Sequence, residues 1–268
     1  MKIALLNDTH CGVRNNHQMF AEYQGRFYSQ IFFPYLDKHD IKTIIHLGDY
    51  FDRRRDVNFY SLHKNYEHFV KPMLDRDMTM DLIVGNHDIY FKNTNELNSP
   101  DYLLDFENIN VFKDPIVKDY DGLSICLVPW INSENYDDVE EFLGICKADI
   151  AMIHGEITGA MVTPGHYQGG GLSPKFFKRF EQVYSGHFHI KSELANIQFL
   201  GSQMEFTWND WGDEKHFHIL DTESRELTAV HNPLKMYHKV FYDDTDETHE
   251  TQFFLASCKI FPFLSSKP

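Results

Sequence analysis

Five short polar motifs in this sequence each stand at the end of a short apolar run. Apolar runs of this length, bounded by glycine, asparagine or aspartate, are typical of buried strands. In open α/β sheets, ligands gather in the crevice outside the carboxyl ends of the strands, so polar residues there are expected to converge. The motifs are Asp8-Thr9-His10, Gly48-Asp49-Tyr50-Phe51-Asp52, Gly85-Asn86-His87-Asp88, His154 in IHGE, and Gly186-His187-Phe188-His189.

The first half of the chain alternates strand-like and helix-like segments. Strands are expected at 2–7, 42–47 and 81–84, and helices at 19–36, which Pro34 bends or ends, and at 58–76. This order predicts parallel strands joined by crossover helices. Further short strands are expected at 124–128, 150–153, 182–185, 198–200, 217–220 and 227–231. We therefore predict an α/β fold whose second half is richer in antiparallel strands.

Length and composition indicate a globular chain. Its 268 residues are 42% hydrophobic and 24% charged, an ordinary globular balance. The sequence contains no run of 18 apolar residues, so no membrane-spanning helix is expected. Residues 1–235 are expected to form one domain and residues 236–268 a C-terminal tail. The tail contains an acidic stretch at 243–250 and an apolar one at 253–268. The glycine-rich stretch 158–171 is either a flexible connector or a substrate loop.

Net charge and cysteine content limit the binding partners and the cellular compartment that this chain is expected to have. The formal net charge of −15 argues against a broad nucleic-acid-binding face, although metal ions and a few basic residues can hold nucleic acid locally. The four cysteines lie far apart, with no CxxC pair, which indicates reduced thiols of a cytoplasmic protein. They are Cys11, Cys126, Cys146 and Cys258.

The residue types in the five motifs favour a transition metal. Aspartate, asparagine and histidine suit Mn, Fe or Zn better than Ca, and the lack of thiolates argues against a structural zinc site. Seven candidate ligands are too many for one tetrahedral ion, but they are enough for two ions that share a carboxylate. Such two-metal sites clamp the attacking and leaving oxygens of a phosphoryl displacement. The candidates are Asp8, His10, Asp49, Asn86, His154, His187 and His189.

In this order, the motifs DxH, GDxxD, GNHD, H and GHxH resemble the calcineurin-like metallophosphoesterase superfamily. Within it the chain is most similar to the SbcD-type nuclease subunits of double-strand-break repair, in particular the phage recombination-nuclease branch. That resemblance rests on the stretches at 46–55, 83–93, 127–135, 184–189 and 195–202. It implies a four-layer α-β-β-α sandwich, in which helices flank two mixed β-sheets.

The resemblance also assigns the ligands. One metal ion would be held by Asp8, His10, Asp49 and His189. The second would be held by Asp49, Asn86, His154 and His187, so Asp49 would bridge the two ions. The cofactors implied are two divalent ions, with Mn(II) preferred.

Three further residues are catalytic candidates, of which the resemblance assigns roles to His87 and Asp88. His87 matches the residue that protonates the leaving oxygen or stabilises the phosphorane, with Asp88 or a nearby carboxylate as its partner. Position 52 departs from many cellular relatives, which carry a histidine there, whereas Asp52 matches the phage branch. Asp52 is expected either to pair with Arg53 or Arg54 or to support a metal ligand.

The basic run that follows, Arg53, Arg54 and Arg55, has two interpretations. It is either a solvated face or a set of phosphate contacts for the substrate.

Taken together, the resemblance implies a two-metal DNA nuclease that acts on DNA ends or hairpins in recombination and double-strand-break repair. Two alternatives stay open: another calcineurin-like phosphoesterase (a phosphomonoesterase or cyclic-nucleotide phosphodiesterase), and a non-catalytic DNA-binding subunit. The protein would act in the cytoplasm of a bacterial or phage-infected bacterial cell, and a membrane is not among its expected partners. DNA, an SMC-like ABC ATPase subunit and a second copy of the chain are the expected partners. The tail 236–268 is expected to be the remnant of a truncated DNA-capping domain, which weakens the expectation of ATPase coupling.

Overall fold

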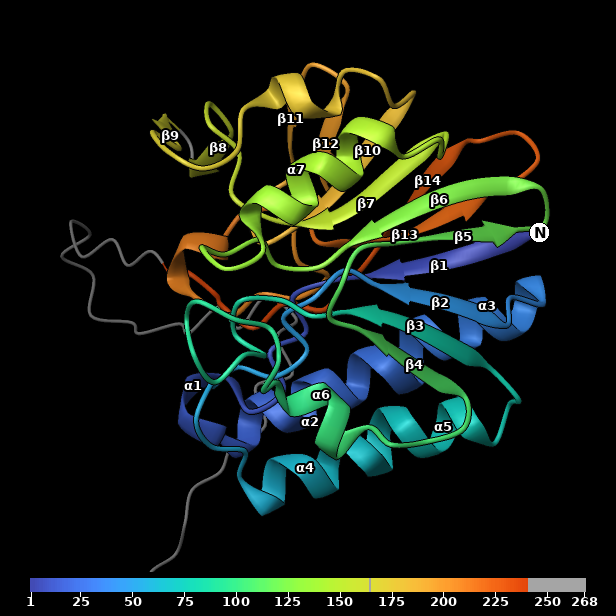
Figure 1. Ribbon diagram of the computed structural model, residues 1–268. Coiled ribbons are helices and arrows are strands. Elements are labelled where there is room, and N and C mark those ends of the chain that lie inside the picture. The colour runs from blue at the N-terminus through green and yellow to red at the C-terminus, as the bar shows by residue number, and fades with distance from the viewer. Residues whose placement is uncertain (164, 241–268) are drawn as a thin grey trace, which may run out of the picture. The chain divides into compact units, whose positions relative to one another are not determined.

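Two six-stranded sheets form the centre of the fold, and the computed structural model describes residues 1–163 and 165–240 (Figure 1). The first sheet contains, in spatial order, β14 (Leu227–His231), β13 (His216–Asp221), β1 (Lys2–Leu6), β2 (Thr43–His46), β3 (Thr79–Ile83) and β4 (Ile109–Phe112). The second contains β11 (Ser192–Leu194), β12 (Ile197–Phe199), β10 (Gln182–Gly186), β7 (Ile150–His154), β6 (Leu123–Val128) and β5 (Ile116–Tyr120).

Both sheets are mixed. Strands β1 to β4 are parallel, and β13 and β14 continue that sheet in antiparallel pairing. In the second sheet β6, β7, β10 and β12 are parallel, whereas the edge strands β5 and β11 are antiparallel to their neighbours. A separate hairpin pairs β8 (Met161–Thr163) with β9 (His166–Tyr167).

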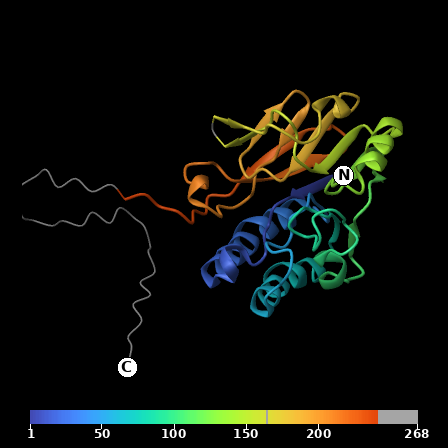
Figure 2. The same ribbon diagram turned by 60° about the vertical axis from the view of Figure 1, so that its left-hand side comes forward.

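Helices cover the outer face of each sheet (Figures 1 and 2). The first sheet packs against α2 (Gln18–Phe27), α3 (Phe33–His39), α4 (Phe59–Asn65) and α5 (Lys71–Leu74). The second packs against α7 (Tyr136–Ile145) and a 3₁₀ turn at Pro174–Phe177. The remaining short helices are α1 (Val13–Asn16), α6 (Ser99–Leu103) and a 3₁₀ turn at Trp208–Asp210. The layers are therefore helix, sheet, sheet, helix, as the sequence predicted.

The strand sequences explain this layering. In β1, Ile3 and Leu5 pack into the core between the sheets, while Ala4 and Leu6 pack into the core under the helices. Side chains alternate between the two faces of a strand, so a strand covered on both faces is apolar at every position. This is why the central strands stand out in the sequence as unbroken apolar runs.

The two long helical segments are less regular than expected, and the first is longer. The helix predicted at 19–36 runs from Gln18 to His39 and contains a π-helical turn at Tyr28–Phe32. Pro34 lies in the first turn of α3, directly after that turn, and the segment continues past it to His39, so Pro34 does not end the helix. Proline fits the first turn of a helix because its missing N–H has no partner to lose there. Pro72 stands in the same place in α5, after the π-helical turn Tyr66–Val70.

The sequence analysis did not anticipate β4, β5, β11, α6 or α7, and the stretch 158–171 holds the β8–β9 hairpin. Contacts between Cα atoms join Met1–Tyr237 into one compact unit. The acidic stretch 243–250, the apolar stretch 253–268 and Cys258 lie outside the described residues, so the predictions for the tail stay predictions. The three described cysteines are free, as predicted. None of the helices in the described part of the chain has the length and apolarity needed to span a membrane.

Candidate metal centre

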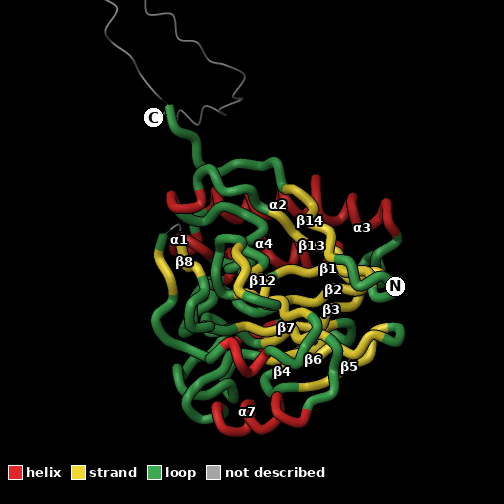
Figure 3. The backbone as a smooth tube through the Cα atoms, turned by 90° about the horizontal axis from the view of Figure 1, so that it is seen from above, coloured by secondary structure: helices red, strands yellow, loops and turns green. Residues whose placement is uncertain are grey.

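The loops that follow the strands gather at the end of the sheets away from the N-terminus (Figure 3). Backbone hydrogen bonds join the loop after β1 to the loop after β2. The amide of Asp8 donates to the carbonyl of Gly48 at 2.9 Å, and the amide of His10 donates to the carbonyl of Asp49 at 3.1 Å. The two loops are thus held in register beyond the sheet, so Asp8, His10 and Asp49 lie side by side.

Two contacts tie the second sheet to these loops. His154 is the last residue of β7, and its Nδ1 lies 2.6 Å from the carbonyl oxygen of Leu47. His187 directly follows β10, and its backbone amide donates to Oδ2 of Asp8 at 2.9 Å. Motifs from both sheets therefore meet at one place.

Three motif glycines allow this close approach. A Cβ at Gly48 would lie 2.5 Å from Nδ1 of His154, and one at Gly186 would lie 2.6 Å from the carbonyl oxygen of Leu47. A Cβ at Gly85 would lie within 3.0 Å of both the backbone nitrogen and Oδ1 of Asp49. No larger residue fits these positions without moving the loops.

Four of the predicted ligands have left-handed backbone conformations. Their φ angles are 49° for Asp8, 45° for His10, 56° for Asp49 and 84° for His187. Such angles are uncommon for residues other than glycine, and they persist only where surrounding contacts hold them. Backbone strain of this kind concentrates at functional sites, so its presence here supports a functional role for the loops.

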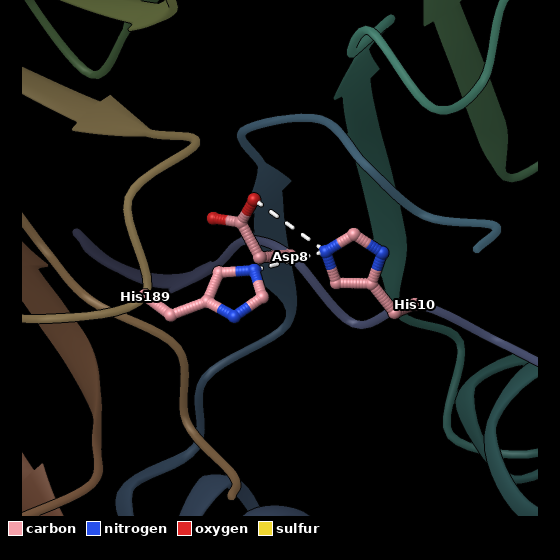
Figure 4. A group of neighbouring side chains, drawn as sticks. All are labelled: Asp8, His10 and His189. Carbon is pink, nitrogen blue, oxygen red and sulfur yellow. Dashed lines mark hydrogen bonds and ion pairs between the residues drawn. The ribbon is translucent and has the colours of Figure 1, made fainter. Parts of the chain in front are cut away.

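The first cluster of donors contains Asp8, His10 and His189, shown in Figure 4. Nε2 of His10 lies 3.0 Å from Nε2 of His189 and 4.0 Å from Oδ1 of Asp8. The carboxylate and the two rings thus offer three donor atoms to one point. Asp8 and His10 are buried, while His189 is half-buried.

The second cluster contains Asp49, His154 and His187, with Asn86 between the rings. Oδ1 of Asn86 lies 3.0 Å from Nε2 of His154 and 2.9 Å from Nδ1 of His187. Oδ2 of Asp49 lies 3.4 Å from Nε2 of His154. The same oxygen lies 3.9 Å from Nε2 of His10, so Asp49 reaches both clusters.

Burial and neighbouring charges set the protonation of these side chains. Burial alone would raise the pKa of Asp49, but His154 holds it well below its usual range. Burial alone would lower the pKa of His154, but the Asp49 carboxylate raises it to about 9. Burial, together with His10, lowers the pKa of His189 to about 4. The imidazolium of His154 thus balances the Asp49 charge, and a divalent ion would take over that role once His154 gives up its proton, while His189 is neutral at pH 7.

These residues fit divalent cations. Within each cluster the donor atoms lie within 4.8 Å of one another. The neutral His189 ring directs Nε2 at Nε2 of His10, 3.0 Å away, and that pair of nitrogens is suited to share a positive ion. Both clusters combine imidazole nitrogen with carboxylate oxygen, the donor mixture of Mn, Fe and Zn sites.

Asp52 and His87 lie at the edge of the first cluster. Oδ1 of Asp52 is 3.4 Å from Nδ1 of His10, on the opposite side of that ring from Nε2. Asp52 therefore orients His10, which favours the predicted support of a ligand over pairing with arginine. Nδ1 of His87 lies 2.6 Å from the carbonyl oxygen of Asp52, and the ring meets His10 edge to face at 4.8 Å. His10, Asp52 and His87 form a third group with metal-binding geometry.

Asp88 is bound to backbone amides. Its carboxylate accepts hydrogen bonds from the amides of Phe51 at 2.9 Å and Gly85 at 2.8 Å. Burial, together with the charge of Asp49, raises the pKa of Asp88 to about 6. The ring nitrogen of His87 is held by the carbonyl of Asp52 instead. Asp88 thus fixes the loops around Gly85, and its predicted partnership with His87 stays a prediction.

An open pocket of about 360 Å³ lies over the clusters. It is lined by His10, Val13, Arg14, Asn15, Asp49, Asp52, His87, His187, His189, Phe206 and Thr207. None of Arg53, Arg54 and Arg55 lines it. Arg53 forms an ion pair with Asp56 at 3.0 Å, and Arg55 lies over the Tyr90 ring at 6.0 Å.

Comparison with known proteins agrees with this geometry. The calcineurin-like phosphoesterase family matches residues 1–191, which include every predicted metal ligand. The chain belongs to the calcineurin-like phosphoesterase family. Phosphoesterases of this family use divalent metals, and the three groups of donors described above are candidates to hold them.

A phage protein is similar over most of this phosphoesterase. Exonuclease subunit 1 of Enterobacteria phage T4 is 32% identical over 246 residues, which make up 90% of this chain and 71% of that protein. The predicted resemblance to the phage recombination-nuclease branch is thereby confirmed.

Two solved structures are more distant. An archaeal phosphodiesterase is 16% identical in sequence with a TM-score of 0.45, and the match covers 87% of this chain and 100% of the archaeal chain. A phosphatase from Mycoplasma pneumoniae is 9% identical in sequence with a TM-score of 0.46, and the match covers 87% of this chain and 93% of the phosphatase chain. Scores at this level add nothing to the description of the phosphoesterase fold given above.

Several residues around the phosphoesterase site were missed by the sequence analysis. Glu156 lies 3.5 Å from Nε2 of His187, and its place in the IHGE motif was the available signal. Arg14 and Phe206 line the pocket, but neither belongs to a motif. The ring of Trp130 lies 5.3 Å from that of His187.

Replacing Gly85 by alanine is expected to lower both metal content and stability. The new methyl group would overlap the Asp49 backbone and carboxylate, so the loop that carries Asp49 must move. Overpacking of this kind costs roughly 1–3 kcal/mol. Metal analysis and thermal unfolding of the purified variant test this expectation.

Gly144→Ala is the matched control. Gly144 lies in the last turn of α7 with nothing near its added Cβ, so alanine there should leave metal content unchanged and stabilise the helix. Full metal occupancy and unchanged stability in Gly85→Ala would show that the loops tolerate the methyl group.

Proposed function

We propose that this phosphoesterase is a two-metal DNA nuclease that hydrolyses phosphodiester bonds at DNA ends or hairpins during recombination and double-strand-break repair. The observation that carries the proposal is the convergence of all seven predicted ligands around Asp49, in a chain similar to an exonuclease subunit. The openness of the pocket supports it, since a polynucleotide strand needs a site that it can cross.

The residues have distinct parts in the proposed reaction. Asp8, His10, Asp49 and His189 would hold one ion, and Asp49, Asn86, His154 and His187 the other. Divalent ions bound there would supply the Lewis acidity that phosphodiester hydrolysis needs. Asp52 orients His10, and His87 faces the same pocket, where it would give a proton to the leaving oxygen.

Activity is expected to require a divalent metal and to be higher with Mn(II) than with Mg(II). Four of the seven proposed ligands are imidazoles, whereas Mg(II) prefers oxygen ligands and retains its waters. The assay follows cleavage of a labelled hairpin duplex by metal-stripped protein in Mn(II), in Mg(II) and in EDTA. Full activity in EDTA would contradict the metal requirement, and greater activity in Mg(II) would contradict the preference.

The substrate preference of the same protein distinguishes a DNA nuclease from the other phosphoesterase activities. Single-stranded and duplex DNA are compared with p-nitrophenyl phosphate and cyclic nucleotides at equal metal concentration. The proposal expects the highest kcat/KM on DNA. Faster turnover of a monoester or a cyclic nucleotide would instead favour another phosphoesterase activity. The substrate has to decide between these activities, because they use the same metal ligands. DNA binding without turnover of any of these substrates would favour a non-catalytic subunit.

A second subunit is part of the proposal. The T4 relative is named as a subunit of an exonuclease, which supports a partner for this chain as well. We propose an SMC-like ABC ATPase as that partner, and stimulation of DNA cleavage by ATP in the reconstituted pair tests it. The predicted homodimer is tested by sedimentation of the chain alone.

A further inference from the structure

We propose that Arg14 forms a phosphate subsite in the pocket, where its guanidinium binds the substrate phosphate next to the one being cleaved. The inference rests on the proposed nuclease function and deepens it. It depends on the side-chain contacts of Arg14, on the charge of the pocket, and on the backbone that presents the side chain.

The contacts place Arg14 beside the metal clusters without making it part of them. Its Nε donates to the carbonyl oxygen of Phe206 at 2.8 Å. The Phe206 ring lies 5.6 Å from the His10 ring and 5.7 Å from the His189 ring. Because Phe206 stands against the imidazoles, the guanidinium lies outside the donor clusters, where a neighbouring phosphate of the strand would pass.

The charges of the pocket leave Arg14 available. Among the residues that line the pocket it is the one lysine or arginine, facing Asp49, Asp52 and several imidazoles. Three other arginines are neutralised by carboxylates: Arg53 by Asp56, Arg76 by Asp37 and Arg225 by Glu181. Arg14 is exposed and forms no ion pair with a carboxylate in the described part of the chain.

The chemistry of the free end suits a phosphate. The bond from Nε to Phe206 fixes the direction of the guanidinium, and no residue in the described ranges accepts a hydrogen bond from its two terminal nitrogens. A planar pair of N–H donors binds two oxygens of a phosphate at once, which a lysine ammonium does not do. The chain's net charge of −15 argues against a broad basic surface, so a local contact of this kind would contribute much of the attraction to DNA.

The backbone around Arg14 is held in an unusual conformation. Arg14, Asn15 and Asn16 have φ angles of 55°, 58° and 60°, three left-handed residues in a row without a glycine. L-residues rarely adopt this conformation in succession, so contacts from elsewhere must maintain it. Ser61 of α4 donates to Oδ1 of Asn16 at 2.8 Å, and Arg53 donates to Oδ1 of Asn15 at 3.3 Å.

These anchors also give Arg53 a part in the site. The sequence analysis offered it as a phosphate contact or a solvated residue, and the structure shows it bound to the turn that carries Arg14. The strained turn, fixed at Asn15, Asn16 and Arg14, is therefore built to present one guanidinium to the pocket.

The test uses Arg14→Gln, with Arg26→Gln as the matched control. Arg26 is exposed on α2 and does not line the pocket, so its loss removes the same charge at another place. In Arg14→Gln, kcat/KM for a DNA oligonucleotide should fall about 10- to 100-fold, the worth of one charge-assisted pair. In Arg26→Gln it should stay within about twofold of wild type, as expected for an exposed charge away from the site. Metal content and unfolding temperature of Arg14→Gln should match those of wild type.

Two substrates locate the contact. A series of oligonucleotides carries one neutral methylphosphonate, placed in turn at each position near the cleavage site. At the contacted position the neutral group should slow wild type but cause no further loss in Arg14→Gln. Bis(p-nitrophenyl) phosphate has no neighbouring phosphate, so both proteins should hydrolyse it equally.

The outcomes separate this inference from the proposed function. If wild type cleaves DNA and Arg14→Gln cleaves it equally well, the subsite is wrong and the nuclease stands. Methylphosphonate effects that are the same in both proteins at every position would also overturn the subsite. If wild type hydrolyses bis(p-nitrophenyl) phosphate but not DNA, the nuclease function is wrong, and the subsite falls with it.

Discussion

Asp49→Ala is expected to lose both metal ions and, with them, its activity. The Asp49 carboxylate lies 3.4 Å from Nε2 of His154 in one cluster and 3.9 Å from Nε2 of His10 in the other. Its other oxygen accepts the backbone amide of His87 at 2.7 Å, which fixes its orientation. Among the described carboxylates, Asp49 alone lies within 4.0 Å of histidine ring nitrogens in both clusters, because Asp8 contacts His187 only at its backbone amide. Since losing an outer partner of a ligand already weakens metal affinity about 10- to 100-fold, losing the shared ligand should weaken it further.

Metal analysis and a titration with Mn(II) measure this effect. Asp81→Asn is the control, because Asp81 is also a buried aspartate of the first sheet but pairs with Lys118 at 2.6 Å, away from the pocket. That variant should lose stability and keep its metal. Two equivalents of Mn(II) bound to Asp49→Ala with wild-type affinity would contradict the bridging role.

The central strands were predictable because both of their faces are buried. Ile3 and Leu5 face the other sheet while Ala4 and Leu6 face the helices, so the sequence shows an uninterrupted apolar run. The edge strand β5 buries only one of its five residues, and α7 buries only Val139 and Leu143. With so little apolar patterning, neither element could be distinguished from a loop by sequence alone.

The convergence of the candidate ligands was predictable for a related reason. Each follows a recognisable strand, and parallel strands bring their carboxyl ends to one edge. Arg14 could not be found this way, because a left-handed turn and a contact with Phe206, distant in sequence, bring it to the pocket. The two interpretations of Asp52 were separated only by the structure, since its contact with His10 depends on how the loops pack.

His87→Ala is expected to keep its metal and to slow DNA cleavage by about 10²- to 10⁴-fold, the usual worth of a general acid. Its Nδ1 is engaged by the carbonyl oxygen of Asp52 at 2.6 Å, so that nitrogen is the donor and Nε2 is left for the pocket. His10, its neighbour, already directs Nε2 toward Asp8 and His189. The first ion is therefore expected to be held without His87, although His10, Asp52 and His87 form a group of their own.

The metal content of His87→Ala decides whether His87 is a metal ligand or a general acid. The dependence of the rate loss on the leaving group then tests whether His87 protonates the leaving oxygen. A DNA alkoxide needs a proton to leave, whereas p-nitrophenolate leaves without one. The loss in His87→Ala should therefore be large on DNA and small on bis(p-nitrophenyl) phosphate, and His87→Gln should behave in the same way. Equal losses on both substrates would indicate that His87 stabilises the phosphorane instead of protonating the leaving oxygen. Loss of metal from His87→Ala would make it a ligand, and the group that it forms with His10 and Asp52 would then be a metal site.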